Sequence, residues 1–375
     1  MASDGPRAAR PSITLASDDP VHRVLVTGGA GFVGVSLCLH LAERRPGWTL
    51  VALDNLKRRG SELNVSRLRS AGVEFVHGDV RSRGDLDQIG AVDAIVECSA
   101  EPSALAGVDG KTGYLVDTNL VGAYNCLEVA RTSGAQLIFL STSRVYPHTL
   151  LAGARLEERA NRFDLAEQQD IPGLTVRGVS EDFPVRGGRT LYGTTKLAAE
   201  LLVEEYRATF GLRTIVNRCG VLAGPWQMGK ADQGVFTHWA LAHWFGLPLS
   251  YIGYGGSGKQ VRDLLHVEDL ARLIEEQLAD PDAWDGILVN VGGGVDCSLS
   301  LRETTELCRE LTGRNLPVSA SCEERPGDVP FYASDCSRLF ERTTWRPLRA
   351  AADIMGDIVA WIAANEQALR ALRGI

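Results

Sequence analysis

The segment Thr27-Gly28-Gly29-Ala30-Gly31-Phe32-Val33-Gly34 directly follows the apolar run Val24-Leu25-Val26. A short β-branched run of this kind predicts a buried strand. The three glycines Gly28, Gly31 and Gly34 then allow a tight turn, a close approach of backbone to a phosphate, and close packing of a helix on the strand. Residues 33–41 have apolar and small side chains at helical spacing. The N-terminus of such a helix offers free N–H groups and a positive dipole end to a pyrophosphate.

An acidic residue completes this pattern. Asp54 ends the next predicted strand, about twenty residues further on, where a carboxylate meets the ribose hydroxyls of a bound dinucleotide. A glycine cluster alone also fits an ordinary loop, so the prediction rests on strand, glycines, helix, strand and acid in this order. Asp54 would repel the extra phosphate of NADP, whereas Lys57, Arg58 and Arg59 could attract it. We favour NAD because the acid sits at the strand end.

The composition is that of an ordinary enzyme. The chain has 375 residues, of which 45% are hydrophobic and 23% charged, and its net charge is −8. This charge argues against nonspecific binding to nucleic acid, and no apolar stretch approaches the ~20 residues that span a membrane. Residues 1–20 are polar and predict a disordered tail. The eight cysteines form no CxxC pair, and Cys38, Cys98, Cys126 and Cys219 lie in apolar surroundings, which favours a reducing cytoplasm.

The order of the elements predicts an α/β fold. Strand-like and helix-like segments alternate through the first half, which indicates a doubly wound parallel sheet with helices on both faces. We expect strands at 24–27, 50–54, 73–77, 94–97, 136–141 and 213–219, and helices at 119–133, 192–210 and 350–372. The predicted domains are a dinucleotide-binding domain over 21–220, interrupted by an insertion at 147–189, and a smaller substrate-binding lobe over 221–375. Part of the sheet is expected to return near 261–295, and 224–260 to be mostly irregular.

A tyrosine and a lysine form the second strong pattern. Tyr192 and Lys196 are four residues apart on a predicted helix, so they share one face. An ammonium favours the phenolate form of tyrosine, whose free pKa is about 10, and a positive nicotinamide ring adds to this effect. Tyr192 would then take a proton from a sugar hydroxyl, and Thr142, at a strand end, would hydrogen-bond the same oxygen. A surface YxxxK or a turn threonine are the alternatives.

With these residues in place, the chain resembles the extended short-chain dehydrogenase/reductase family, in particular the nucleotide-sugar epimerases and dehydratases. The blocks TGGAGFVG, LDNL, GDV, STSRVY, YGTTK and VRDLLHVEDL match family blocks in order, over about residues 21–361. The resemblance implies a Rossmann domain that binds NAD and a small C-terminal lobe that holds the nucleotide sugar.

The resemblance also implies roles for individual residues. The catalytic set is Thr142, Tyr192 and Lys196. The NAD contacts are Gly28, Gly31, Phe32, Val33 and Gly34 at the phosphates, Asp54 and Asn55 at the adenosine ribose, Asp79, Val80 and, as a weaker suggestion, Arg58 near adenine, with Ala100, Asn119, Tyr192 and Lys196 along the rest of the cofactor. The substrate contacts are Ser103, Thr142, Ser143, Arg144, Gln227, Gln233, Arg262, Arg325 and Asp328. A guanidinium suits a diphosphate because it offers paired donors. The alternatives are a surface ion pair of Arg262 with Asp263 and a solvated turn for Arg325 and Asp328.

Within this family the likeness is greatest to CDP-paratose (CDP-tyvelose) 2-epimerases. The shared stretches are LDNLKRRGSELN, FVHGDVRSRGDL, DQGVF at 232–236, GKQVRDLLHVEDL and VGGGVDCSLSL. Dehydratases of the family place an Asp-Glu pair after the active-site threonine, where this chain has Ser143 and Arg144. The segment between Thr142 and Tyr192 is longer than usual, and Val221 stands where many relatives have Asn. A 4-epimerase acting on a UDP- or GDP-sugar, a net dehydrogenase or dehydratase, and a non-catalytic dinucleotide sensor are the other hypotheses.

Two expectations concern partners and metals. The family usually pairs through a four-helix bundle, which here would use 119–133 and 192–210 in a homodimer. His238 and His243 are five residues apart and flanked by Trp239 and Trp244. This spacing favours aromatic core packing over a zinc site, and no complete set of metal ligands is evident.

Overall fold

The computed structural model describes residues 23–103, 105–229 and 233–375. The predicted tail at 1–20 and Asp232, which opens the DQGVF stretch, lie outside these residues. A seven-stranded parallel sheet forms the larger half, in the order β14-β10-β5-β4-β1-β2-β3. Its strands are β1 (Arg23–Thr27), β2 (Thr49–Asp54), β3 (Glu74–His77), β4 (Ala94–Glu97), β5 (Gln136–Thr142), β10 (Thr214–Cys219) and β14 (Ile287–Val291). The prediction of a Rossmann-type parallel sheet is confirmed.

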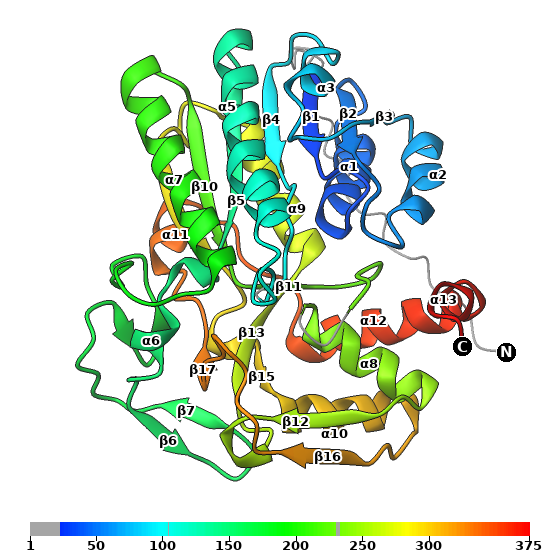
Figure 1. Cartoon of the computed structure of the whole chain (residues 1–375), viewed down its shortest axis with the longest axis vertical. Coiled ribbons are helices and arrows are strands. Elements are labelled where there is room, and N and C mark those ends of the chain that lie inside the picture. The colour runs from blue at the N-terminus through cyan, green and yellow to red at the C-terminus, as the bar shows by residue number, and fades with distance from the viewer. Residues whose placement is uncertain (1–22, 104, 230–232) are drawn as a thin grey trace, which may run out of the picture.

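Helices cover both faces of this sheet (Figure 1). On one face α1 packs against α9, and on the other α5 packs against both α3 and α7. The chain runs outward from β1 to β3 and then returns to β4, so the strand order reverses between β1 and β4. Ligands bind at such a reversal, outside the carboxyl ends of the strands. These helices, with α2 beside β3 and α11 beside β14, are α1 (Phe32–Arg44), α2 (Glu62–Ser70), α3 (Arg83–Asp87), α5 (Gly122–Ser133), α7 (Leu191–Phe210), α9 (Val267–Ala279) and α11 (Ser337–Arg342).

A smaller lobe lies below the carboxyl edge of the sheet (Figure 1). Its strands are β11 (Val221–Ala223), β13 (Val261–His266), β15 (Ser298–Ser300) and β17 (Phe331–Tyr332), with the separate pair β12 (Leu249–Ile252) and β16 (Val318–Ser321). Its mutually packed helices are α8 (Val235–Phe245), α10 (Leu301–Thr312) and α12 (Ala351–Ala364).

Part of this lobe corrects the expectation of irregular structure over 224–260, because α8 and β12 lie there. Helix α8 buries Phe236, Trp239 and His243, which share one face, and also Leu241 on the opposite side. A helix that is apolar on all sides lacks the two-faced periodicity by which a surface helix is identified in a sequence.

The insertion at 147–189 contains short elements. They are α6 (His148–Leu151), the antiparallel pair β6 (Leu156–Glu158) and β7 (Phe163–Leu165), and the antiparallel pair β8 (Leu174–Thr175) and β9 (Gly178–Val179). Leu165, Leu174, Val179 and Phe183 form a buried cluster with Tyr332 of the lobe. The insertion is therefore packed as a side wall of the lobe.

Two helix boundaries differ from the prediction. The helix expected at 119–133 begins earlier, as α4 (Gly113–Val116), and passes through the π-helical turn η1 (Asp117–Val121) before α5. The helix expected at 350–372 is divided at Asn365 into α12 and α13 (Glu366–Arg373). Asn365 has φ −120° and its side-chain amide donates to the Trp361 carbonyl, so the backbone leaves the helical path there. Across the described ranges, no helix combines the length and the apolar character needed to cross a membrane.

Candidate active site

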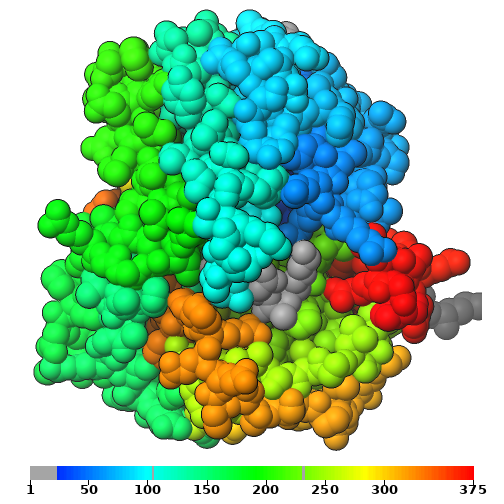
Figure 2. All heavy atoms as spheres, viewed as in Figure 1, coloured from blue at the N-terminus to red at the C-terminus, as the bar shows by residue number. Residues whose placement is uncertain are grey.

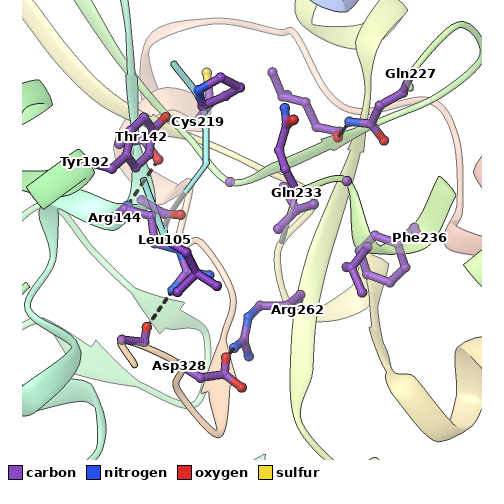
Figure 3. Close-up of a pocket in the computed structure, with 18 of the residues that line it drawn as sticks. Leu105, Thr142, Arg144, Tyr192, Cys219, Gln227, Gln233, Phe236, Arg262 and Asp328 are labelled. Carbon is purple, nitrogen blue, oxygen red and sulfur yellow. Dashed lines mark hydrogen bonds and ion pairs between the residues drawn. The ribbon is translucent and has the colours of Figure 1, made fainter. Parts of the chain in front are cut away.

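A cleft lies between the parallel sheet and the smaller lobe. It encloses a cavity of about 320 Å³. In the space-filling view the orange segment that contains Arg325 meets the cyan and green segments near the middle of the molecule (Figure 2). Thr142 and Tyr192 lie on one side of the cavity, Gln227, Gln233 and Phe236 on the other, and Arg262 with Asp328 at the bottom of the view (Figure 3). Predicted site residues among its lining are Phe32, Val33, Ala100, Thr142, Ser143, Arg144, Tyr192, Lys196, Gln227, Gln233, Arg262, Arg325 and Asp328.

The backbone of the glycine turn is packed so closely that side chains at its glycines would meet neighbouring backbone atoms. Gly28 has φ +63°, and Gly31 caps α1 without any side-chain hydrogen bond. A Cβ built on Gly34 would lie 2.3 Å from the Gly28 carbonyl oxygen. Because the first N–H groups of a helix have no partner within the helix, the glycine turn and the N-terminus of α1 fit the phosphates of a dinucleotide. This is the observation that supports NAD binding at this edge.

The two carboxylates that the sequence predicts at the adenosine, those of Asp54 and Asp79, have well-defined hydrogen-bond partners. Asp54 is buried at the end of β2, and its carboxylate accepts hydrogen bonds from the Ala30 N–H at 3.1 Å and the Leu56 N–H at 2.8 Å. Burial raises the pKa of Asp54, and these N–H groups oppose that rise. Asn55 donates to Asp79 at 2.9 Å, and Val80 is buried next to it.

The environment of Asp79 includes Arg81, which sequence reasoning did not single out. Arg81 donates to both carboxylate oxygens of Asp79, at 3.0 and 2.7 Å. Burial acts to raise the pKa of Asp79, but hydrogen bonds from Arg81 and Asn55 lower it to about 2. Asp79 is therefore an anion held in a fixed orientation. Arg58, in contrast, donates to the Met228 carbonyl at 3.0 Å, so it ties the β2 loop to the smaller lobe instead of lying free for adenine.

The proposed catalytic residues come together. Thr142 ends β5, and Tyr192 and Lys196 lie one turn apart near the start of α7, whose N-cap is Thr190. Tyr192 and Thr142 both line the cavity (Figure 3). Burial raises the pKa of Tyr192, whereas the Lys196 ammonium and the nearby Thr142 hydroxyl act to lower it. The expectation that Lys196 lowers this pKa is thus right in direction, but burial outweighs it.

Asn119 lies in the π-helical turn beside this site. Its side-chain oxygen accepts from the Glu101 N–H at 2.8 Å, and its amide donates to the Glu101 carbonyl and to Thr195 on α7, each at 3.3 Å. These bonds hold the loop that carries Ala100 and Ser103 against α7. Ser103 lies between Pro102 and Leu105, which line the cavity.

The lobe presents charged groups to the opposite side of the cavity. Arg262 donates to Asp328 at 2.5 Å and to the Val329 carbonyl at 2.7 Å, and Arg144 donates to the Gly327 carbonyl at 2.9 Å (Figure 3). Gln227 bonds the Leu222 carbonyl and Thr237, beside Gln233. The alternative pairing of Arg262 with Asp263 is wrong. Asp263 is fully buried and accepts the Ser334 N–H at 3.0 Å, because alternate residues of a strand face opposite sides.

Sequence reasoning missed Glu97 in this site. It ends β4, is 1% exposed, and lies 3.3 Å from the Lys196 ammonium. The available signal was a carboxylate at the end of an apolar strand beside the predicted ligand edge. Of the described residues, no group of three or more His, Cys, Asp or Glu is placed to hold a metal ion. His243 is buried, and its Nδ1 is 2.9 Å from the Trp239 carbonyl, which fits core packing.

Comparison with known proteins agrees with this geometry. Residues 24–292 match the model of the NAD dependent epimerase/dehydratase family. The chain belongs to this family. It is 30% identical to a CDP-paratose 2-epimerase of Salmonella typhi, over 90% of this chain and 98% of that protein. It is 26% identical to a dTDP-glucose 4,6-dehydratase of Salmonella typhimurium, over 92% of this chain and 94% of that protein.

Solved structures show the same fold. A Thermus thermophilus UDP-glucose 4-epimerase in complex with NAD has a TM-score of 0.73 and 26% identity, covering 91% of this chain and 99% of that one. Family membership confirms the predicted Rossmann fold, the NAD dependence and the assignment of this protein as an epimerase/dehydratase-type enzyme. The comparisons do not distinguish the sugar, the nucleotide base or the carbon that reacts, because relatives that catalyse different reactions have similar sequence identity to this chain.

Proposed function

We propose that this enzyme is an NAD-dependent nucleotide-sugar epimerase that oxidises a sugar hydroxyl transiently and returns the hydride to the opposite face. The observation that carries this proposal is a cavity that is lined on one side by Tyr192 and Thr142 and on the other by Arg262, Arg325 and Asp328. One wall supplies proton transfer, and the other supplies charged groups suited to a sugar linked to a diphosphate.

In this mechanism the phenolate of Tyr192 takes the proton of a sugar hydroxyl, and Thr142 hydrogen-bonds the same oxygen. When bound, NAD supplies the hydride acceptor and donor, and a positive charge near the phenol. Lys196 supports the phenolate by its own charge. Arg262 would release Asp328 and bind the diphosphate of the substrate. The keto-sugar then rotates in the site, so that the hydride returns to its opposite face and Tyr192 returns the proton. The cycle is redox-neutral, so NAD should remain bound.

The finer proposal is epimerisation at C2 of a CDP-linked deoxyhexose. It is supported by the similarity to a CDP-paratose 2-epimerase and by the shared sequence stretches. It is also supported by Ser143 and Arg144, which follow Thr142 where the dehydratase pattern has an acid and a base. Loss of water without such a pair lacks its proton carriers.

The test is a panel of CDP-, UDP-, GDP- and dTDP-sugars, with products identified by NMR. We expect the C2 epimer of a CDP-deoxyhexose, no net NADH, and no solvent deuterium at carbons beside the reacting centre. A Tyr192→Phe variant should fold and bind NAD but lose at least 100-fold in kcat, because the proton acceptor is gone. Steady accumulation of NADH would indicate a net dehydrogenase instead of an epimerase. A dehydrated keto-sugar as product would indicate a dehydratase.

We also propose that two copies pair through η1–α5 and α7. These helices lie side by side on one edge of the molecule (Figure 1). Val121, Tyr124 and Leu201 are 39%, 44% and 59% exposed on them. Large apolar side chains gathered on an outer helix pair are typical of a surface that another molecule covers.

A further inference from the structure

A buried carboxylate lies directly under the lysine of the proposed catalytic set. Glu97 is the last residue of β4, opposite Thr27 of β1 and Phe139 of β5. Its side chain is 1% exposed and that of Lys196 is 3% exposed, and their charged atoms are 3.3 Å apart. The Lys196 ammonium also lies 4.1 Å from the centre of the Phe139 ring. The Lys196 ammonium thus contacts the Glu97 carboxylate and the face of the Phe139 ring, which lie on neighbouring strands of the sheet.

Glu97 has little else to stabilise its charge. Its second oxygen, Oε1, has no hydrogen-bond partner among the described residues. Burial raises the pKa of Glu97, and the Lys196 ammonium and the Ser99 N–H oppose that rise. The Lys196 ammonium favours the anionic form of this buried carboxylate, and without the lysine burial would favour the protonated form.

The other titratable groups near this pair are neutral or lie toward Tyr192. The thiols of Cys98, Cys126 and Cys219 have pKa values raised by burial, to about 12 for Cys219, so they carry no charge at neutral pH. Arg144 lies on the Tyr192 side, where its charge acts to lower the pKa of the phenol. Glu97 is therefore the anion that faces Lys196, and it offsets the positive charge on which the Tyr192 phenolate depends.

We propose that Glu97 is a positioning residue, which fixes the Lys196 ammonium on the floor of the cleft and sets the ionisation of Tyr192 by offsetting that ammonium's charge. The inference rests on the proposed function for the role of Tyr192. Removal of an anion makes proton loss from a nearby group easier, so Tyr192 should lose its proton at a lower pH when Glu97 is neutral.

The experiment titrates Tyr192 in the NAD-loaded enzyme without substrate. Tyrosinate absorbance is followed against pH, and the curve of a Tyr192→Phe variant is subtracted to isolate one phenol. We expect Glu97→Gln, which keeps the shape of the side chain, to lower the apparent pKa of Tyr192 by about one unit, a tenfold change in its ionisation constant. An unchanged or higher pKa would overturn the proposal.

A double-variant cycle tests whether the effect passes through Lys196. In a Lys196→Met background Glu97 should already be protonated, so adding Glu97→Gln should move the Tyr192 titration by less than a third of its effect in the wild type. An equal shift in both backgrounds would contradict the role of the lysine. Glu275→Gln is the matched control: it neutralises another buried, ion-paired carboxylate, on α9, and should leave the titration unchanged.

This titration needs no turnover, so it separates the two proposals. If Glu97→Gln shifts the phenol while no nucleotide sugar is epimerised, the positioning role stands and the proposed function fails. If epimerisation is found but Glu97→Gln does not shift the Tyr192 titration, the proposed function stands and the positioning role of Glu97 fails. Thermal melting of each variant with NAD shows whether the folded enzyme was titrated.

Discussion

At the scale of single residues, the glycines of the first turn leave no room for a side chain. A Cβ on Gly34 would lie 2.3 Å from the Gly28 carbonyl oxygen and 2.7 Å from the Gly29 Cα. These are backbone atoms, so the clash is not relieved by a side-chain rotation. Such overpacking costs typically 1–3 kcal/mol and would displace the turn that receives the phosphates.

We therefore expect Gly34→Ala to lower the free energy of unfolding by about 2 kcal/mol and to weaken NAD binding at least tenfold. Urea unfolding and calorimetric titration with NAD measure the two effects. Gly47→Ala is the control, because a Cβ at Gly47 meets nothing within 4 Å. Equal behaviour of the two variants would show that the α1 packing does not need Gly34.

At the scale of elements, one carboxylate joins α1 to α9. Glu275 on α9 accepts from the Arg45 guanidinium at 2.9 Å and lies 2.8 Å from the His40 ring, and its side chain is 11% exposed. Burial acts to raise the pKa of Glu275, but the bond with His40 and the charges of His40 and Arg45 lower it overall. A pKa that is lower in the folded state means that the group stabilises the fold above its unfolded pKa and loses this contribution as pH falls through the folded value.

The Glu275→Gln variant should be less stable than the wild type by about 2 kcal/mol at pH 7, and the difference should shrink as pH falls below the ordinary glutamate pKa of about 4.3. Urea midpoints measured at several pH values follow this convergence. Glu43→Gln changes an exposed glutamate on α1 and should have little effect. A Glu275 difference that stays constant down to acid pH would mean that the carboxylate charge is not what stabilises the helix pair.

At the scale of the whole molecule, the apolar side chains on η1–α5 and α7 bear on assembly. If two copies pair there, Leu201→Glu places a charge in the interface and should give a monomer by sedimentation velocity, with at least a tenfold weaker self-association. Leu348→Glu makes the same change at a residue that is 70% exposed elsewhere, and it should leave the assembly as it was. A wild-type protein that is already monomeric would contradict the pairing.

The sequence alone determined the outline of this protein, because its signals are local. Strand, glycine turn, helix and acid follow one another within about thirty residues, and Tyr192 and Lys196 are one helical turn apart, so neither inference needs a long-range contact. A helix buried on opposite sides lacks such a signal, which is why α8 was expected to be irregular.

Only the tertiary structure decided which distant residues meet. Glu97 on β4 reaches Lys196 on α7, Arg262 pairs with Asp328 instead of its neighbour Asp263, and Arg58 binds the Met228 carbonyl across the cleft. The position of a residue along the chain says on which side of a strand its side chain falls, but the packing of other elements on that side decides its partner. For this reason the kinds of residue in the active site were predictable, whereas the charge balance around the phenol was not.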